Sequence, residues 1–274
     1  MSVRKDASGR RSVEVEIEVP GTPEEVWQTI ATGPGISSWF VPTEVEERDG
    51  VPVAVTSHFG PGMDAVASVT EWDPPRRFAA DGQALGPKAP PVATEWIVEA
   101  RSGGTCVVRV IHSLFASSDE WDDQLESFES GWATFFRILH LYLTHFRGQR
   151  CSAFRVMSVV SEPPSKAWDT LTGPLNVAGA TPGQQWRTSA APRLSGIVEP
   201  TGAGVPSHTL LLRVDEPAPG IVSVFAHAGG HQVYVGMDFF LYGDGAAAAV
   251  ARDEPLWHAW MNEQFPPVSN LSSV

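Results

Sequence analysis

Cysteine, long hydrophobic runs and targeting signals are scarce or absent in this sequence of 274 residues, and each scarcity excludes a class of protein. The two cysteines, Cys106 and Cys151, are too few for a disulfide framework or a zinc module. No apolar run approaches the roughly 20 residues that a membrane-spanning helix requires. The first residues, MSVRKDASGRR, are polar and show no signal peptide. We therefore expect a cytoplasmic protein.

Positive charge is also scarce. The sequence has 19 basic and 32 acidic residues, which gives a net charge of −13. Only three of the basic residues are lysines, a bias of the kind that GC-rich bacterial genomes produce. The longest basic runs are the pairs Arg10–Arg11 and Arg76–Arg77. Because bulk charge of this sign repels phosphate-rich surfaces, we predict neither nucleic acid nor an anionic membrane as a partner.

Motifs of the common catalytic and cofactor-binding sites are missing as well. The sequence contains no G-x-S-x-G elbow, no G-x-x-x-x-G-K phosphate loop, no G-x-G-x-x-G and no H-E-x-x-H. His227 and His231 flank a Gly-Gly turn, but no Asp, Glu or Cys at suitable spacing completes a metal site. We predict no metal and no cofactor.

The first forty residues predict a strand, a short helix and an aromatic pair. Residues 12–19, SVEVEIEV, alternate strictly between apolar and acidic side chains, which predicts a half-buried antiparallel strand. Thr22 is a suitable N-cap for a short helix. The segment 33–35, Gly-Pro-Gly, is expected to end that helix after about ten residues. Trp39 and Phe40 follow directly, and we expect them at the rim or floor of an apolar cavity.

The next residues predict a run of strands and then a long helix. The strand predictions are 43–47, 53–59, 65–72, 77–80, 94–100 and 105–113. From about 118 to 146, apolar residues recur at helical spacing, so a helix of roughly 40 Å is expected. A curved sheet moves away from a straight helix that lies across it. We therefore expect an internal hollow between the two.

The second half of the chain repeats this plan in reduced form. A strand is predicted at 152–160, and the following PPSKAWDTLTGP repeats the phrase TPEEVWQTIATGPG of the first half. Five further strands and a short final helix at 254–265 complete the pattern. The prediction is an α+β protein of two tandem domains, 1–150 and 151–274, each a curved antiparallel sheet wrapped on a C-terminal helix.

Several of these segments are similar to a known family. VEVEIEVPGTPEEVWQTIATGPGISSWF, VTEWDPPRRF and TEWIVEA followed by CVVRVIHSLF resemble the START-like SRPBCC superfamily. They look most like its branch named after the activator of the heat-shock-protein-90 ATPase. The resemblance covers residues 12–146 and implies a helix-grip fold with an internal hydrophobic cavity. It implies little about a reaction, because members bind lipids, cyclise polyketides or act as co-chaperones. Residues 152–265 resemble the superfamily less strongly and are expected to be a degenerate copy.

The predicted site lies in the first domain. If Val108 and Val110 face the cavity, His112 does so too, because strand side chains alternate with a period of two. His112 is then a candidate general acid/base or polar anchor, and the alternative is a hydrogen-bonded structural histidine. The predicted ligand-binding residues are Trp39, Phe40, Trp96, His112, Phe115, Trp132, Phe136 and His140.

The sequence is compatible with three functions. The first is binding of a small hydrophobic or aromatic ligand in the cavity of the first domain. The second is an enzyme of the polyketide cyclase or dehydratase type that uses His112 as acid/base. The third is a co-chaperone-like role with a protein partner, which no sequence feature marks. Whether the protein forms a homodimer is left open.

Overall fold

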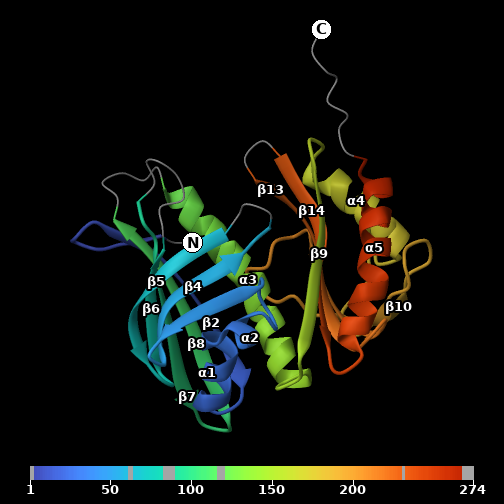
Figure 1. Cartoon of the computed structure of the whole chain (residues 1–274). Helices are drawn as coiled ribbons and strands as arrows, with labels where there is room; N and C mark the ends of the chain where they lie inside the picture. Colours follow the sequence, from blue (N-terminus) through green and yellow to red (C-terminus); the bar gives the residue numbers. More distant parts are fainter. Residues whose placement is uncertain (1–2, 61–63, 83–89, 116–120, 230–231, 267–274) are drawn as a thin grey trace. The chain divides into compact units, whose positions relative to one another are not determined.

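The computed structural model describes residues 3–60, 64–82, 90–115, 121–229 and 232–266. The chain forms two compact units, one of residues 1–147 with 203–205 and one of residues 148–202 with 206–274. Each unit contains one antiparallel sheet and a long helix that follows the last strand, as Figure 1 shows. The predicted α+β fold with tandem helix-grip units is confirmed.

The first unit begins with two strands and two short helices, continues with six strands and ends with a long helix. These elements are β1 (Arg4–Lys5), β2 (Arg10–Pro20), α1 (Pro23–Ala31), α2 (Gly33–Ile36), β3 (Thr43–Arg48), β4 (Val51–His58), β5 (Asp64–Asp73), β6 (Arg77–Gly82), β7 (Ala93–Arg101), β8 (Thr105–Phe115) and α3 (Asp122–His145). The strands form one sheet in the order β1-β2-β8-β7-β6-β5-β4-β3.

The connection from β2 to α1 has the predicted chemistry. Thr22 and Glu25 form a reciprocal capping box, in which the Glu25 amide donates to the Thr22 hydroxyl and the Thr22 amide donates to the Glu25 carboxylate at 2.9 Å. The helix ends at Ala31, close to the predicted position. The capping box therefore fixes the direction in which α1 leaves β2.

The first helix ends before residues 33–35, as predicted, but these residues are themselves helical. They form the short helix α2, whose N-cap Thr32 accepts a hydrogen bond from the Gly35 amide at 3.1 Å. Pro34 is tolerated because it lies in the first turn. A Cβ on Gly35 would lie 2.1 Å from the Gln28 carbonyl oxygen, so the close approach of α2 to α1 requires glycine.

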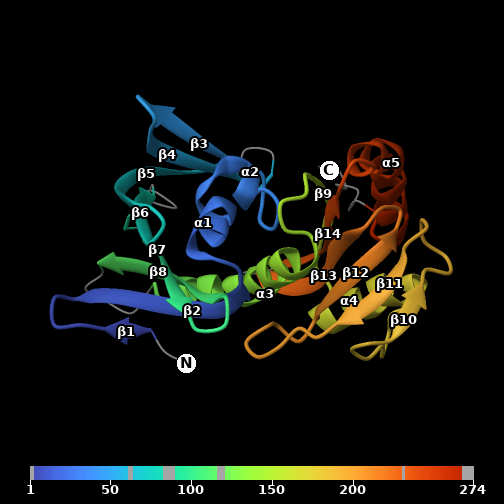
Figure 2. The same cartoon turned by 90° about the horizontal axis from the view of Figure 1, so that it is seen from below.

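The long helix α3 covers one side of the curved sheet. It packs mainly along β2 and also meets β8. Figure 2 shows the sheet of this unit curving from β2 round to β3, with α1, α2 and α3 on its inner side. The predicted start of the helix at residue 118 lies outside the described residues. Because β4 to β6 curve away from α3, side chains must fill the space between them or leave it open.

An ion pair joins the start of α3 to β2. The Arg11 Nε donates to Asp122 Oδ1 at 2.6 Å, and its second nitrogen contacts Asp122 Oδ2. The Arg11 side chain is 7% exposed and that of Asp122 is 26% exposed. The adjacent guanidinium lowers the pKa of the Asp122 carboxyl. A bidentate, mostly buried pair of this kind is stronger than a surface pair.

We expect Asp122→Asn to lower the free energy of unfolding of the first unit by about 1 to 2 kcal/mol, because it removes one charge of a desolvated pair. Urea unfolding, followed by hydrogen exchange of peptides from β2, measures this. Asp73→Asn is the matched control, since Asp73 pairs with Arg76 at the surface and such pairs contribute about 0 to 1 kcal/mol. Equal losses in the two variants would contradict a special role for the Arg11–Asp122 pair.

The second unit repeats the plan with fewer strands. Its elements are β9 (Cys151–Val160), α4 (Pro164–Leu175), β10 (Gln185–Arg187), β11 (Ser195–Glu199), β12 (Thr209–Glu216), β13 (Gly220–Gly229), β14 (Gln232–Tyr242) and α5 (Ala246–Gln264). The sheet order is β10-β11-β12-β13-β14-β9. Helix α4 packs on β13 and β14, and α5 packs on β9 and β14.

Aromatic contacts within the sheet and between the sheet and α5 fill its core. Phe154 and Phe239 stack at 4.3 Å between ring centroids, and Phe239 lies 5.1 Å from Trp257 of α5. The predicted start of the last helix at residue 254 is wrong, since α5 begins at Ala246. The alanine run at its start favours a helix without producing an amphipathic pattern, so periodicity does not reveal it. In the described part of the chain, we find no helix with the length and apolar character to span a membrane.

Candidate functional site

A cavity of about 690 Å³ lies on the inner side of the first unit's sheet. Its floor comes from β4 to β8, and its other walls come from α1, α2 and α3. Strand pairing explains which side chains face it. Thr94 pairs with both Ala80 and His112, and paired residues of antiparallel neighbours lie on the same face. The inward face along β6 to β8 therefore carries small or polar side chains in one row, which leaves space above them.

Aromatic rings make most of the cavity wall. The rings of Phe40 and Trp132 stack at 5.0 Å, and Trp96 meets Trp132 edge-on at 5.0 Å. Trp39 is fully buried, and its indole N–H donates to the Thr29 carbonyl oxygen at 3.0 Å. Phe59 packs edge-on against Phe40 at 5.7 Å and is 36% exposed. Burial and the hydrogen bond to Thr29 therefore hold Trp39 in place, whereas Phe59 lies where the cavity wall meets solvent.

His112 is held from both sides of its ring. Trp132 donates its indole N–H to Nε2, and Nδ1 lies 2.9 Å from the Thr94 hydroxyl. An indole nitrogen only donates, so Nε2 must be the unprotonated nitrogen of a neutral imidazole. Nδ1 then carries the hydrogen and donates it to Thr94. The side chain is held in one tautomer by its two neighbours.

Burial favours the same neutral state. His112 is 8% exposed, and desolvation lowers its pKa from 6.5 to about 4. The imidazole is therefore uncharged over the whole range in which an ordinary histidine titrates. Both observations agree with the alternative of a hydrogen-bonded structural histidine, and they place the ring at the cavity wall.

The structure brings together five of the predicted ligand-binding residues, since Trp39, Phe40, Trp96, His112 and Trp132 all line the cavity. Three others lie elsewhere. Phe115 is 66% exposed because odd positions of β8 face away from His112. Phe136 is buried behind the wall against Trp132 and Trp96. The His140 Nδ1 lies 3.1 Å from the Glu18 carbonyl oxygen, at the β2 side of α3.

Sequence reasoning missed the small and polar part of the lining. Ser57, Ala67 and Ala80 line the cavity from three neighbouring strands. Each of these residues is inward because it pairs with another inward residue, for example Ala67 with Val55. The signal lies in the register between strands, which a single sequence does not show.

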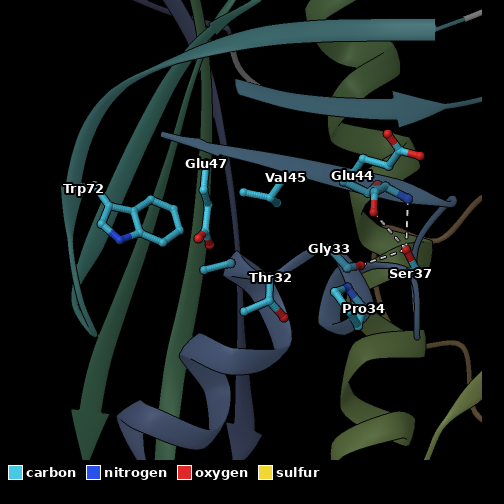
Figure 3. A pocket seen from close by; sticks show the side chains of 10 residues that line it. Thr32, Gly33, Pro34, Ser37, Glu44, Val45, Glu47 and Trp72 are labelled. Carbon is cyan, nitrogen blue, oxygen red and sulfur yellow. Dashed lines mark hydrogen bonds between the residues drawn. The ribbon is translucent and has the colours of Figure 1, made fainter. Parts of the chain in front are cut away.

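A second hollow, of about 630 Å³, lies between the α1–α2 segment and β3. Figure 3 shows its lining, with Glu44 on the side of Pro34 and Ser37, and with Trp72 on the opposite side beyond Glu47. The Ser37 hydroxyl there donates to the Gly33 carbonyl oxygen at 2.8 Å, so it is used by the protein itself. The carboxylates are exposed and do not converge. We therefore centre the candidate site on the aromatic cavity.

Metal-binding geometry is not found in the described ranges, where no three His, Cys, Asp or Glu side chains gather as a metal site requires. Of the two histidines considered for such a site, His227 lies on β13, and His231 lies outside the described residues. Burial and the adjacent Arg155 lower the pKa of His227.

Comparison with known proteins identifies relatives of the first unit. Residues 10–133 match the family model described as "Polyketide cyclase / dehydrase and lipid transport". The match runs from β2 into α3 and so covers the elements that build the cavity. It confirms the resemblance to the SRPBCC superfamily. No curated protein matches the chain.

Three solved structures are similar to the chain. The di-domain ARO/CYC BexL, from the BE-7585A biosynthetic pathway, is 15% identical, with 94% of this chain and 99% of that chain covered and a TM-score of 0.45. CalU16 from Micromonospora echinospora is 18% identical, with coverages of 52% and 82% and a TM-score of 0.41. The Aha1 dimer from Colwellia psychrerythraea is 17% identical, with coverages of 50% and 98% and a TM-score of 0.38.

Proposed function

We propose that the protein binds a small, uncharged aromatic molecule in the cavity of its first unit. The observation that carries the proposal is the cavity of about 690 Å³ with aromatic walls and few polar groups. Within the described residues, its lining includes no lysine or arginine, and Asp64 is its one carboxylate. A ligand with a carboxylate or phosphate group would find no counter-charge among these described lining residues.

The size of the cavity is compatible with useful affinity. Burying about 200 Å² of apolar ligand surface contributes roughly 5 kcal/mol before the costs of association. Part of this is lost as translational and rotational freedom, but the wall loses little because Trp39 and Trp96 are already fixed by packing. Micromolar dissociation constants are therefore expected for ligands of two or three fused rings.

A neutral dye tests the proposal. N-phenyl-1-naphthylamine should bind the purified protein with a dissociation constant of about 1 to 10 μM and gain fluorescence, because the cavity excludes water. Native mass spectrometry should show a stoichiometry of one. An anionic dye with the same ring system serves as control and should bind at least tenfold more weakly, for lack of a counter-charge. No saturable binding of either dye would refute the proposal.

Catalysis of the cyclase or dehydratase type is the second candidate, and the family match over residues 10–133 favours it. In that case His112 is the acid/base residue that the proposal uses, since it lines the cavity. For Nε2 to exchange a proton, Trp132 must first withdraw its indole N–H. Conversion of an aromatic polyketone that is lost in His112→Gln would support catalysis. Binding of the polyketone without any conversion by the unsubstituted protein would leave binding as the function.

A further inference from the structure

The hydroxyl groups that line the cavity among the described residues are those of Thr43, Ser57 and Thr94. Thr94 of β7 and Ser57 of β4 differ in whether a hydrogen bond within the protein uses the hydroxyl hydrogen. A hydroxyl carries one hydrogen and two acceptor sites. Once the protein determines where that hydrogen goes, the hydroxyl presents either a donor or an acceptor to a ligand.

At Thr94 the direction follows from the chain of bonds through His112. Trp132 donates to Nε2 of the imidazole, so Nδ1 carries its hydrogen and donates it to the Thr94 oxygen at 2.9 Å. In the described residues this is the side-chain hydrogen bond that Thr94 makes. The Thr94 oxygen therefore accepts from His112, and its own hydrogen is left to point into the cavity that Thr94 lines.

At Ser57 the direction is reversed. The Thr43 hydroxyl donates to the Val41 carbonyl oxygen at 2.9 Å, because a carbonyl can only accept. The contact of 3.2 Å between the Thr43 and Ser57 hydroxyls must then be a donation from Ser57 to Thr43. Because the Ser57 hydroxyl donates its hydrogen to Thr43, it can only accept a hydrogen bond from a ligand.

We infer that the Thr94 hydroxyl is a specificity-determining hydrogen-bond donor, which selects ligands with a carbonyl or similar acceptor oxygen. This rests on the proposed function. The two bonds from Trp132 through His112 to Thr94 run in one direction, and bonds in such a chain strengthen one another. The terminal O–H is thus a better donor than an isolated hydroxyl, in a wall that offers an aromatic ligand few other polar contacts.

Fluorenone and fluorene test this as a pair, because they have the same ring system and differ in one carbonyl. The measured quantity is the ratio of their dissociation constants in equilibrium dialysis with the full-length protein. Thr94→Val should lower the preference for fluorenone about fivefold, the value of one neutral hydrogen bond, and should leave fluorene binding unchanged. Thr94→Ser should keep the preference.

Ser57→Ala is the matched control, since it removes a lining hydroxyl whose hydrogen is already used. It should leave the fluorenone preference unchanged. A second readout is the carbonyl stretching band of bound fluorenone, which should shift to higher frequency in Thr94→Val because the hydrogen bond is lost. Binding of both probes with an unaltered ratio and band in Thr94→Val would overturn the inference and leave the proposed function standing. Binding of neither probe to the unsubstituted protein would overturn both.

Discussion

Replacing Ala67 with Trp should weaken binding of N-phenyl-1-naphthylamine by roughly seventyfold. Ala67 lies on β5 and lines the cavity opposite the aromatic wall. An indole at this position would occupy the space of one ligand ring. If it removes half of about 200 Å² of ligand contact, the loss is about 2.5 kcal/mol. The free energy of unfolding should change little, because the new side chain enters open space. Dye titration and urea unfolding together measure the two quantities.

The neighbouring position provides a matched control. Ser68 is exposed and points to the opposite face of the sheet, because successive strand residues alternate. Ser68→Trp adds the same side chain to the same strand outside the cavity, so dye affinity should stay within about twofold of the original. Equal loss of affinity in both variants would mean that the effect comes from disturbing β5. Unchanged affinity in Ala67→Trp would show that the dye binds elsewhere.

Local patterns in the sequence were sufficient to predict most of the elements in their order, although β1 was not predicted. Strict alternation in residues 12–19 predicted β2, and a Thr-Pro-Glu-Glu run predicted the capped helix α1. The helical spacing of apolar residues predicted α3. The repeat of the Trp27 phrase around Trp168 predicted a second unit with its own helix, α4. Each of these signals depends on neighbours within a few turns or one strand.

For the site, the periodicity of a single strand was the useful signal. Alternation along β8 predicted that His112 faces inward, and both His112 and Trp96 line the cavity, while their binding of a ligand stays a prediction. Phe115 was predicted to bind the ligand, although the alternation along β8 places it on the outer face, where it is 66% exposed. His140 was expected at the cavity end, but the roll of α3 about its own axis turns it toward the Glu18 carbonyl.

Partners between strands could not be predicted, because they depend on register. Thr94 meets His112 since residues 94 and 112 are opposite one another on β7 and β8. Trp132 reaches the same ring from α3, twenty residues further along the chain. Neither relation has a signature in a single sequence. The hydrogen-bond chain that fixes the state of His112 therefore became visible only with the fold.

The burial of His112 has a measurable consequence for stability at acid pH. Its pKa falls from 6.5 in the unfolded chain to about 4 in the folded protein, because burial disfavours the charged imidazole. Between these values the unfolded chain binds a proton that the folded one does not. The stabilisation is therefore complete above pH 6.5 and is lost as the pH falls toward 4. From pH 7 to pH 4.5, the loss from this one group is roughly 2 to 3 kcal/mol.

His112→Gln should remove this part of the acid sensitivity. The glutamine can accept from Trp132 but cannot titrate, so the fall in unfolding free energy from pH 7 to pH 4.5 should be smaller than in the original protein by that amount. Urea unfolding followed by hydrogen exchange of β8 peptides measures it.

Val110→Ala is the control, because Val110 is buried on the same strand and does not titrate. That variant should be less stable at every pH, with its pH dependence unchanged. Parallel curves for His112→Gln and the original protein would mean that folding does not shift the pKa of His112, so that burial does not hold the imidazole in its neutral form at acid pH.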